Sequence, residues 1–364
     1  MIKPQKLKKG DKVAVVSLSS GLLGEPNMIH KYYLAKKRLE EDFGLQVVAM
    51  PNALKGIEYL KNNPKARADD LMMALKDKSV KAIICAIGGS DSYRLLPFID
   101  FDVIKNNPKI FTGFSDSTTN HLMFYKAGVT SFYGPNIMCN FGQYGEMYDY
   151  EVEAVKNVFF NSPKEYEIKP CEYWSNDFIP WDEKNINKMK KVLKDDGYDV
   201  LQGTGKVSGK LLGGCVEILG RFLGVAMSDE QEEIENTQLT KELNDKYNLF
   251  PSKEEWRDKI LFIETSEEKI KPEKLKDILT AMKNYGILDN INGIMVGKPQ
   301  GKVYYEEYKK VYHEIFKNYR KDLPIFYNVN FGHAEPINII PYGVMCEVDC
   351  DNKKITIKEK MLAD

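Results

Sequence analysis

The chain has 364 residues, of which 43% are hydrophobic and 29% are charged, a composition typical of a globular protein and not of a disordered one. Its formal net charge of −1 provides no excess of basic side chains to neutralise the phosphates of a nucleic acid. No apolar run approaches the roughly 18 residues that a membrane span needs, and the six cysteines form no CxxC pair. We therefore expect a soluble, cytoplasmic protein with reduced thiols, and neither a nucleic-acid polymer nor a membrane as partner.

Strand-like and helix-like segments alternate through the first third of the chain. Short apolar or β-branched runs predict the strands, and apolar residues at helical spacing predict the helices between them. In chain order these are a strand at 12–18, a helix at 28–43, a strand at 45–50, a helix at 67–77, and strands at 80–87 and 109–114. The alternation predicts an α/β fold, with a mostly parallel, Rossmann-like or flavodoxin-like sheet flanked by helices.

The rest of the chain has a different character. Residues 160–206 are polar and aromatic, and we interpret them as a connection between domains with some structure of its own; the charged residues 228–257 indicate a surface excursion. We then expect strands at 259–264, 293–297 and 324–328, helices at 272–285 and 303–318, and two or three short strands within 337–358. The predicted division is an N-terminal α/β domain at 1–160, a connection and substrate loop at 161–206, and a C-terminal α/β or β-rich domain at 207–364.

The segment around Ser115 predicts a catalytic nucleophile. The apolar run that contains Phe111 ends at Gly113-Phe114-Ser115-Asp116, and a helix-like segment follows at once. A strand that turns sharply into a helix lifts the serine out of the sheet and directs the helix N-terminus at it, which is the arrangement of a nucleophile elbow. The full GxSxG motif is absent, because Ser117 stands at the position of the second glycine.

A serine nucleophile needs a base, and histidine is the most frequent one. Of the four histidines, His30 and His313 lie in charged helical segments and are expected to face solvent. His121 lies six residues beyond Ser115 on the elbow helix, and we expect it to have a packing role. His333 lies on a glycine-flanked loop directly after the strand at 324–328, where either a catalytic base or an ordinary loop histidine is consistent with the sequence.

The base in turn needs an acid, and the reaction needs donors for an oxyanion. Glu264 closes an apolar strand, where a carboxylate is costly to bury without a partner, and Glu217 is the rival acid. Glu264 is also consistent with a side chain that simply emerges into solvent. The backbone amide of Asp116 and the glycine pair Gly88-Gly89 are the candidate oxyanion donors, although such a pair after a strand is also consistent with a plain turn.

These residues belong to a series of motifs that resembles the LD-carboxypeptidase family of serine peptidases, which also contains the microcin C self-immunity proteins. The resemblance runs from about residue 5 to about residue 350. The motifs, in the order seen in that family, are Gly88–Pro97, Gly113–Asp116, Tyr133–Pro135, Leu212–Gly214, Leu261–Glu264 and Gly332–Pro336.

The resemblance implies a Ser–His–Glu triad in which Ser115 is the nucleophile, His333 the base and Glu264 the orienting acid. It also implies oxyanion amides from Gly89 and Asp116, a homodimer, and an enzyme that works without a metal or other cofactor.

Within the family the chain is most similar to the microcin-immunity branch. The stretch Phe178–Glu183 resembles a loop of that branch whose tryptophan stacks on the nucleotide base of the substrate, so Trp181 is a candidate stacking platform or, alternatively, the anchor of an interdomain loop. Gly88 and Arg94 are further candidates for substrate binding. Arg94 could bind a carboxylate or phosphate by its planar fork, or else forms a structural ion pair. Cys215 departs from the family, which often has Asn there, and this leaves the substrate open.

Two classes of function follow. The first is a serine hydrolase that cleaves an amide in a small peptidyl- or aminoacyl-nucleotide substrate, with murein LD-carboxypeptidase activity, the release of a terminal D-amino acid, as the alternative. The second is a non-catalytic protein that binds a small ligand between two domains, with the elbow serine binding an anion at its helix N-terminus.

Overall fold

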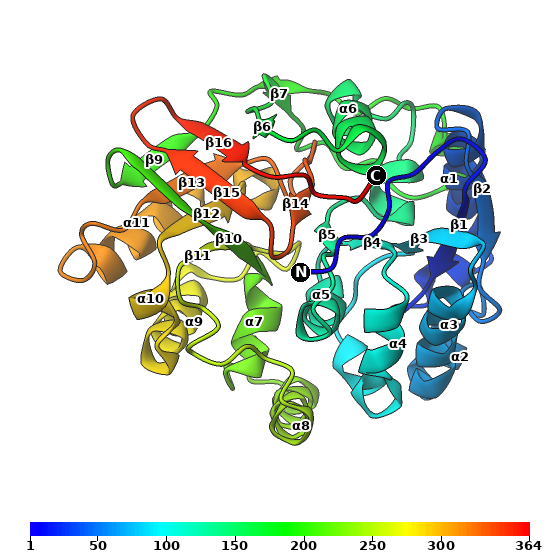
Figure 1. Ribbon diagram of the computed structural model, residues 1–364, viewed down its shortest axis with the longest axis horizontal. Coiled ribbons are helices and arrows are strands. Elements are labelled where there is room, and N and C mark those ends of the chain that lie inside the picture. The colour runs from blue at the N-terminus through cyan, green and yellow to red at the C-terminus, as the bar shows by residue number, and fades with distance from the viewer.

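The computed structural model describes all 364 residues and contains two main sheets that lie side by side (Figure 1). The first sheet has six strands in the order β14-β5-β4-β3-β1-β2, and β1 to β5 all run parallel. This confirms the predicted parallel N-terminal sheet. The strands are β1 (Lys12–Val16), β2 (Gln46–Ala49), β3 (Val80–Cys85), β4 (Ile110–Gly113), β5 (Phe132–Tyr133) and β14 (Ile340–Pro341).

Helices cover both faces of this sheet. α3, α4 and α5 pack side by side on one face, and α1 packs with the short helical segment Ile137–Phe141 on the other. Strands β3 and β4 are almost entirely buried, which explains why their sequences are apolar without polar alternation. The helices are α1 (Ile29–Glu41), α2 (Ile57–Asn62), α3 (Pro64–Lys76), α4 (Phe101–Asn106) and α5 (Ser117–Lys126).

The second sheet has eight strands in the order β6-β16-β15-β10-β11-β12-β13-β9, of which β10 to β13 run parallel. Its strands are β6 (Tyr166–Ile168), β9 (Asp199–Gln202), β10 (Lys206–Cys215), β11 (Lys259–Glu264), β12 (Gly293–Gly297), β13 (Ile325–Val329), β15 (Met345–Asp349) and β16 (Lys354–Ile357). Its helices are α7 (Val216–Phe222), α9 (Pro272–Tyr285), α10 (Ile287–Asn290) and α11 (Tyr305–Phe316). The predicted strands and helices between 259 and 328 are confirmed, with small differences at their ends.

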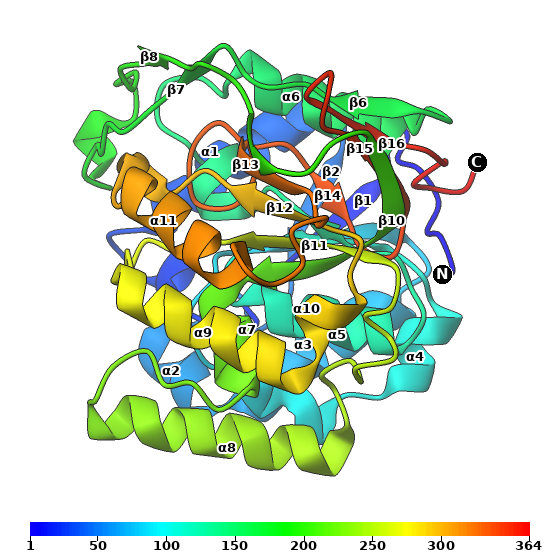
Figure 2. The same ribbon diagram turned by 90° about the vertical axis from the view of Figure 1, so that its left-hand side faces the viewer.

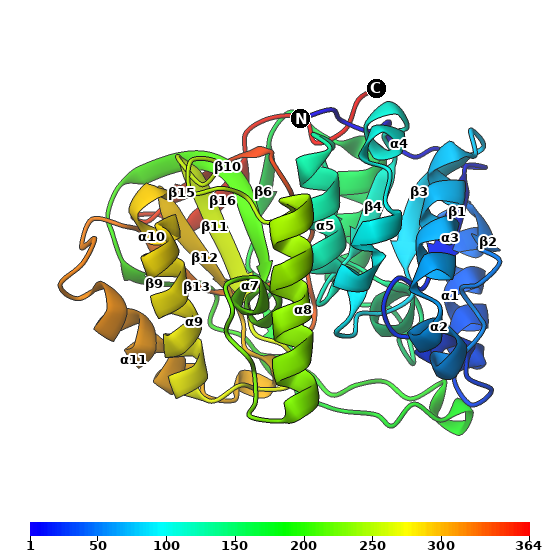
Figure 3. The same ribbon diagram turned by 90° about the horizontal axis from the view of Figure 1, so that it is seen from below.

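The charged stretch 228–257 contains a regular helix, α8 (Gln231–Tyr247), and is more than a surface excursion. α8 packs against α7 of the second half and against the helical turn Ser92–Phe98 of the first, and Figure 3 shows it running along the line where the halves meet. Arg221 of α7 contacts the other two segments. Its guanidinium lies 2.8 Å from the Glu233 carboxylate of α8 and donates at 2.8 Å to the carbonyl oxygen of Ser90, just before the turn. The helix therefore connects the two halves.

The polar stretch 160–206 runs along one end of both sheets (Figure 2). It contributes β6 and β9 to the second sheet and forms a separate small ribbon from β7 (Tyr173–Trp174) and β8 (Leu193–Lys194). α6 (Asp149–Val155) precedes it. One apolar core includes residues of both halves, and the division at residues 160 and 206 stays a prediction. None of the helices combines the length and apolar character that a membrane crossing requires.

Candidate active site

Ser115 lies between the end of β4 and the start of α5, as the elbow prediction required. Its φ angle is +64°, in the left-handed region that costs energy for any residue with a side chain. Gly88 packs directly against it: a β-carbon at Gly88 would lie 2.6 Å from the Ser115 β-carbon and 2.8 Å from its hydroxyl oxygen. The close approach explains the glycine at position 88, and the strained turn presents the Ser115 hydroxyl at the carboxyl end of the sheet.

The Tyr133 side chain, at the end of β5, is hydrogen-bonded to this turn. The Ser115 amide donates to the Tyr133 hydroxyl at 3.0 Å, and that hydroxyl donates to Oε1 of Glu264 at 2.5 Å. Burial together with the nearby Glu264 carboxylate raises the pKa of Tyr133 well above its ordinary value, so it remains a donor. Tyr133 belongs to one of the family motifs, but no role was predicted for it; only its position beside the elbow strand could have indicated one.

Glu264 and His333 meet at the ends of neighbouring segments of the second half. Glu264 is the last residue of β11, and His333 follows β13 on a loop. Oε2 of Glu264 lies 2.7 Å from Nδ1 of His333 and accepts a hydrogen bond from the His333 amide at 3.2 Å. A β-carbon at Gly332 would lie 2.4 Å from the Glu264 carboxyl carbon, so the loop can approach the carboxylate only with glycine there.

The second ring nitrogen of His333 faces another carboxylate. Nε2 lies 2.8 Å from Oε2 of Glu267, and no hydrogen bond of His333 reaches Ser115. Burial acts to lower the pKa of His333, but Glu264 and Glu267 together raise it well above 6.5. We predicted no role for Glu267 from the sequence. Its position three residues after Glu264 was the available signal that it would lie near the same site.

The backbone amides of Gly89 and Asp116 donate no hydrogen bond within the protein, which leaves both available to a ligand. The Asp116 side chain has a different task, because its carboxylate accepts from the Ser19 hydroxyl at 2.6 Å and from the Ser92 amide at 2.8 Å. These bonds join the loops after β1, β3 and β4 around the elbow.

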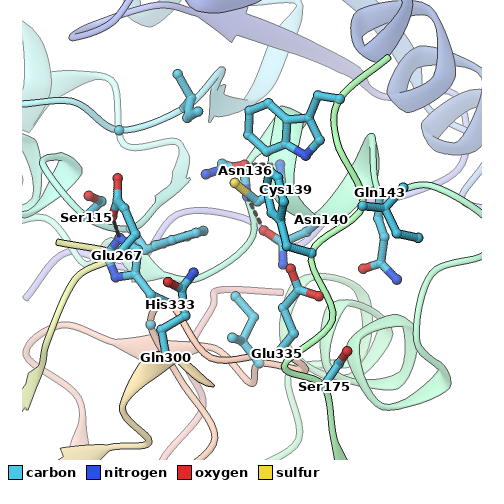
Figure 4. A pocket seen from close by; sticks show the side chains of 18 of the residues that line it. Ser115, Asn136, Cys139, Asn140, Gln143, Ser175, Glu267, Gln300, His333 and Glu335 are labelled. Carbon is cyan, nitrogen blue, oxygen red and sulfur yellow. Dashed lines mark hydrogen bonds and ion pairs between the residues drawn. The ribbon is translucent and has the colours of Figure 1, made fainter. Parts of the chain in front are cut away.

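A cavity of about 470 Å³ opens beside Ser115 and extends under the segment 175–190. Figure 4 shows Ser115, Glu267 and His333 together at one end, with Gln143 at the other. Trp181 lines it, and the buried Lys31 ammonium lies 4.3 Å from the centre of the Trp181 ring. The other lining residues include Gly88, Gly89, Asn136, Cys139, Asn140, Tyr144, Ser175, Asp177, Phe178, Lys190, Lys269, Gln300 and Glu335.

Other residues singled out from the sequence lie elsewhere. Arg94 does not line the cavity, and its guanidinium contacts the Tyr93 hydroxyl at 3.4 Å. Glu217 is buried, and its carboxylate accepts from the amide and the hydroxyl of Ser266 at 2.8 and 2.9 Å. His333 is therefore paired with Glu264 and not with this rival acid.

Among the remaining histidines, the expectation for His30 is wrong. Its ring is buried and lies 2.6 Å from the Tyr144 hydroxyl, because α1 turns this side chain toward Tyr144 and away from water. His121 is fully buried between the Gly113 carbonyl and the Ser131 hydroxyl, which agrees with a packing role. His313 is exposed, as expected.

Comparison with known proteins identifies the family. Residues 13–134 match the family model described as the LD-carboxypeptidase N-terminal domain, and residues 208–348 match the LD-carboxypeptidase C-terminal domain. The chain is 29% identical to the microcin C7 self-immunity protein MccF of Escherichia coli, over 84% of this chain and 81% of that protein. It is 26% identical to a "Probable murein peptide carboxypeptidase" of Bacillus subtilis, over 98% and 94% of the two chains.

A solved structure gives the same result. The crystal structure of an MccF-like protein from Streptococcus pneumoniae in complex with AMP superposes with a TM-score of 0.87 at 37% identity, and the match covers 96% of this chain and 98% of that one. Together the two matched domains span most of the chain and contain Ser115, Glu264 and His333. The chain belongs to the LD-carboxypeptidase family and is a serine peptidase.

Proposed function

We propose that the chain hydrolyses an amide bond with Ser115 as nucleophile, His333 as general base and Glu264 as the acid that orients the imidazole. The observation that carries the proposal is the 2.7 Å contact between the Glu264 carboxylate and Nδ1 of His333. The Tyr133 hydroxyl connects the same carboxylate to the Ser115 amide. The carboxylate fixes the ring so that Nε2 is the nitrogen available for proton transfer, and it stabilises the imidazolium that forms.

The reaction runs in two halves. The Ser115 hydroxyl oxygen bonds to the carbonyl carbon while its proton passes to Nε2 of His333, and the carbonyl oxygen becomes an oxyanion that accepts from the amides of Gly89 and Asp116. His333 then gives the proton to the leaving nitrogen as the C–N bond breaks. Water attacks the acyl-enzyme with His333 again as base, which releases the acid product and restores Ser115.

For the substrate we propose an amino-acid carbonyl linked to a nucleotide-like group. The supports are the position of Trp181 in the cavity and the relative from Streptococcus pneumoniae, which is 37% identical and whose structure holds AMP. A base stacked on this indole gains roughly 1–3 kcal/mol. Release of a terminal D-amino acid from a murein peptide is the second candidate, and the similarity to the Bacillus subtilis protein favours it.

The test is a side-by-side assay of an aminoacyl sulfamoyl adenosine and a murein tetrapeptide with the wild type, Ser115→Ala and His333→Ala. We expect the wild type to hydrolyse the nucleotide-linked substrate and both variants to lose turnover. Cleavage of the tetrapeptide alone would identify the chain as a murein carboxypeptidase instead. Cleavage of neither compound would count against the hydrolase and in favour of the ligand-binding alternative.

The homodimer and the cytoplasmic location implied at the outset remain predictions, as does anion binding by Arg94. Arg94 could serve a substrate only if its side chain turned toward the cavity, because it now contacts Tyr93. Mass measurement of the native protein in solution tests the dimer directly.

A further inference from the structure

Glu267 places a carboxylate at the reacting end of the cavity. It follows β11 by three residues, its side chain is 57% exposed, and its Oε2 lies 2.8 Å from Nε2 of His333. The dashed contact in Figure 4 marks this pair next to Ser115. No other ion pair or side-chain hydrogen bond engages Glu267.

The turn that carries Glu267 is firmly held. The Ser266 amide and hydroxyl both donate to the buried Glu217 carboxylate, and the Lys269 amide closes the turn on the Ser266 carbonyl oxygen at 3.2 Å. Lys269 has a φ angle of +51°, as a tight reversal requires. Glu217, the rival candidate for the acid, therefore anchors the turn that presents Glu267.

The other charged side chains of the cavity have partners of their own or face open solvent. Lys190 lies 2.5 Å from the Glu335 carboxylate, and Lys31 donates to the carbonyl oxygens of Met138 and Gly142. Asp177 accepts from the Lys191 amide, while Lys269 is exposed and forms no ion pair. Glu267 is thus the carboxylate of the cavity whose partner is the base itself.

This contact conflicts with the proposed reaction. Nε2 of His333 must face the Ser115 hydroxyl to accept its proton, yet Glu267 occupies that nitrogen. With a carboxylate at each nitrogen the ring satisfies both only as the imidazolium, which cannot accept a proton. Turnover therefore requires that Glu267 leave Nε2 of His333, and a cation on the substrate would draw the carboxylate away.

The cation that an aminoacyl substrate brings next to its reacting carbonyl is the α-ammonium group. Standard bond lengths place the α-nitrogen about 2.5 Å from the carbonyl carbon, and that carbon lies about 3 Å from the Ser115 oxygen at attack. This inference rests on the proposed function. We propose that Glu267 binds a free α-ammonium group next to the scissile carbonyl, and that this binding releases Nε2 of His333 to Ser115. The substrate class is then an aminoacyl compound with a free amine.

The exchange balances charge and protons. Glu267 moves from the imidazolium to the ammonium, so it keeps one cationic partner throughout. The imidazolium, left with Glu264 alone, loses its Nε2 proton to water and becomes the neutral base. The pKa values agree with this: Glu267 contributes to raising the pKa of His333, and the His333 contact lowers the pKa of Glu267 to about 2.

A murein tetrapeptide does not offer this group, since the nitrogen next to its scissile carbonyl belongs to a peptide bond and carries no charge. The nucleotide-linked substrate does, if its amino acid is not acylated. Glu267 is therefore a specificity-determining residue that separates the two candidate substrates of the proposed function.

The experiment compares an aminoacyl sulfamoyl adenosine with its Nα-acetyl derivative, using the wild type, Glu267→Gln and the matched control Glu268→Gln. Glu268 is the exposed neighbour on the same turn and does not line the cavity. The measured quantity is the ratio of kcat/KM for the free amine to that for the acetylated compound. Loss of one charge-assisted contact predicts a fall of this ratio by about tenfold to one-hundredfold in Glu267→Gln, mainly because KM for the free amine rises. No change is expected in Glu268→Gln.

A second readout excludes a merely structural effect. On the acetylated substrate, which cannot displace Glu267, the Gln variant should be faster than the wild type near neutral pH, because Nε2 is no longer held by a carboxylate. An unchanged ratio with active enzyme would overturn the ammonium subsite and leave the proposed function intact. Absence of hydrolysis of both compounds by the wild type would overturn the proposed function and the subsite with it.

Discussion

Replacing Tyr133 with Phe tests how the two halves of the site are joined. The Tyr133 hydroxyl accepts from the Ser115 amide and donates to Glu264, so it links the strained elbow to the acid of the other half. Phenylalanine fills the same space and removes only the oxygen. The variant therefore isolates the polar link from the packing of the ring.

The magnitude follows from the two groups that lose their partner. An unsatisfied buried amide costs about 1–3 kcal/mol, and a carboxylate that loses a charge-assisted bond costs about 1.5–3 kcal/mol. Ser115 and Glu264 are 8% and 1% exposed, so water replaces neither bond easily. We expect Tyr133→Phe to lower the free energy of unfolding by about 2.5–6 kcal/mol. The variant should also slow the reaction of Ser115, because the backbone at φ +64° loses a hydrogen bond that holds it.

The assay pairs urea unfolding with the rate of labelling by a fluorophosphonate. The control is Tyr59→Phe, which removes one hydrogen bond to the neutral amide of the half-buried Asn52 and should cost at most about 1 kcal/mol. Wild-type stability together with a wild-type labelling rate in Tyr133→Phe would show that this hydroxyl does not hold the elbow.

Three further predictions concern charged groups. Glu264→Gln should reduce kcat by orders of magnitude, while Glu217→Gln should act mainly on stability; the reverse result in a steady-state assay would exchange their roles. Because the pKa of His333 is raised, the acidic limb of the kcat/KM profile should lie above pH 6.5 and move to lower pH in Glu267→Gln; a limb at or below pH 6.5 in the wild type contradicts this. Burial lowers the pKa of Lys31 from 10.5 to about 8, so the unfolded chain binds more protons between those values. Wild-type stability should therefore rise relative to Lys31→Met by about 3 kcal/mol from pH 8 to 10.5, measured by urea unfolding at each pH; parallel curves would refute it.

Much of the fold could be predicted because its signals are local. The apolar, β-branched runs at 259–264 and 293–297 have the sequence of strands covered on both faces, and both are strands with the predicted bounds. The turn from strand to helix at Ser115 was visible for the same reason. α8 was not foreseen as a connecting helix, because a charged segment is equally consistent with a loop until its neighbours are known.

The parts of the site that escaped prediction depend on contacts between distant segments. Tyr133 and Glu264 are far apart in sequence, and only the meeting of the two sheets brings the hydroxyl to the carboxylate. The burial of His30 depends in the same way on Tyr144, which no helical pattern reveals. Arg94 illustrates the converse, since its planar guanidinium suggested an anion site, and the side chain lies outside the cavity.

We propose the Ser115 hydroxyl as the activated nucleophile, and peptide mapping after fluorophosphonate treatment can locate the hydroxyl that reacts. We expect a single adduct on the peptide that contains Ser115, lost in Ser115→Ala and His333→Ala and kept in Ser117→Ala, because Ser117 lies two residues further along, at the start of α5. An adduct elsewhere, or no adduct on active protein, would contradict the account.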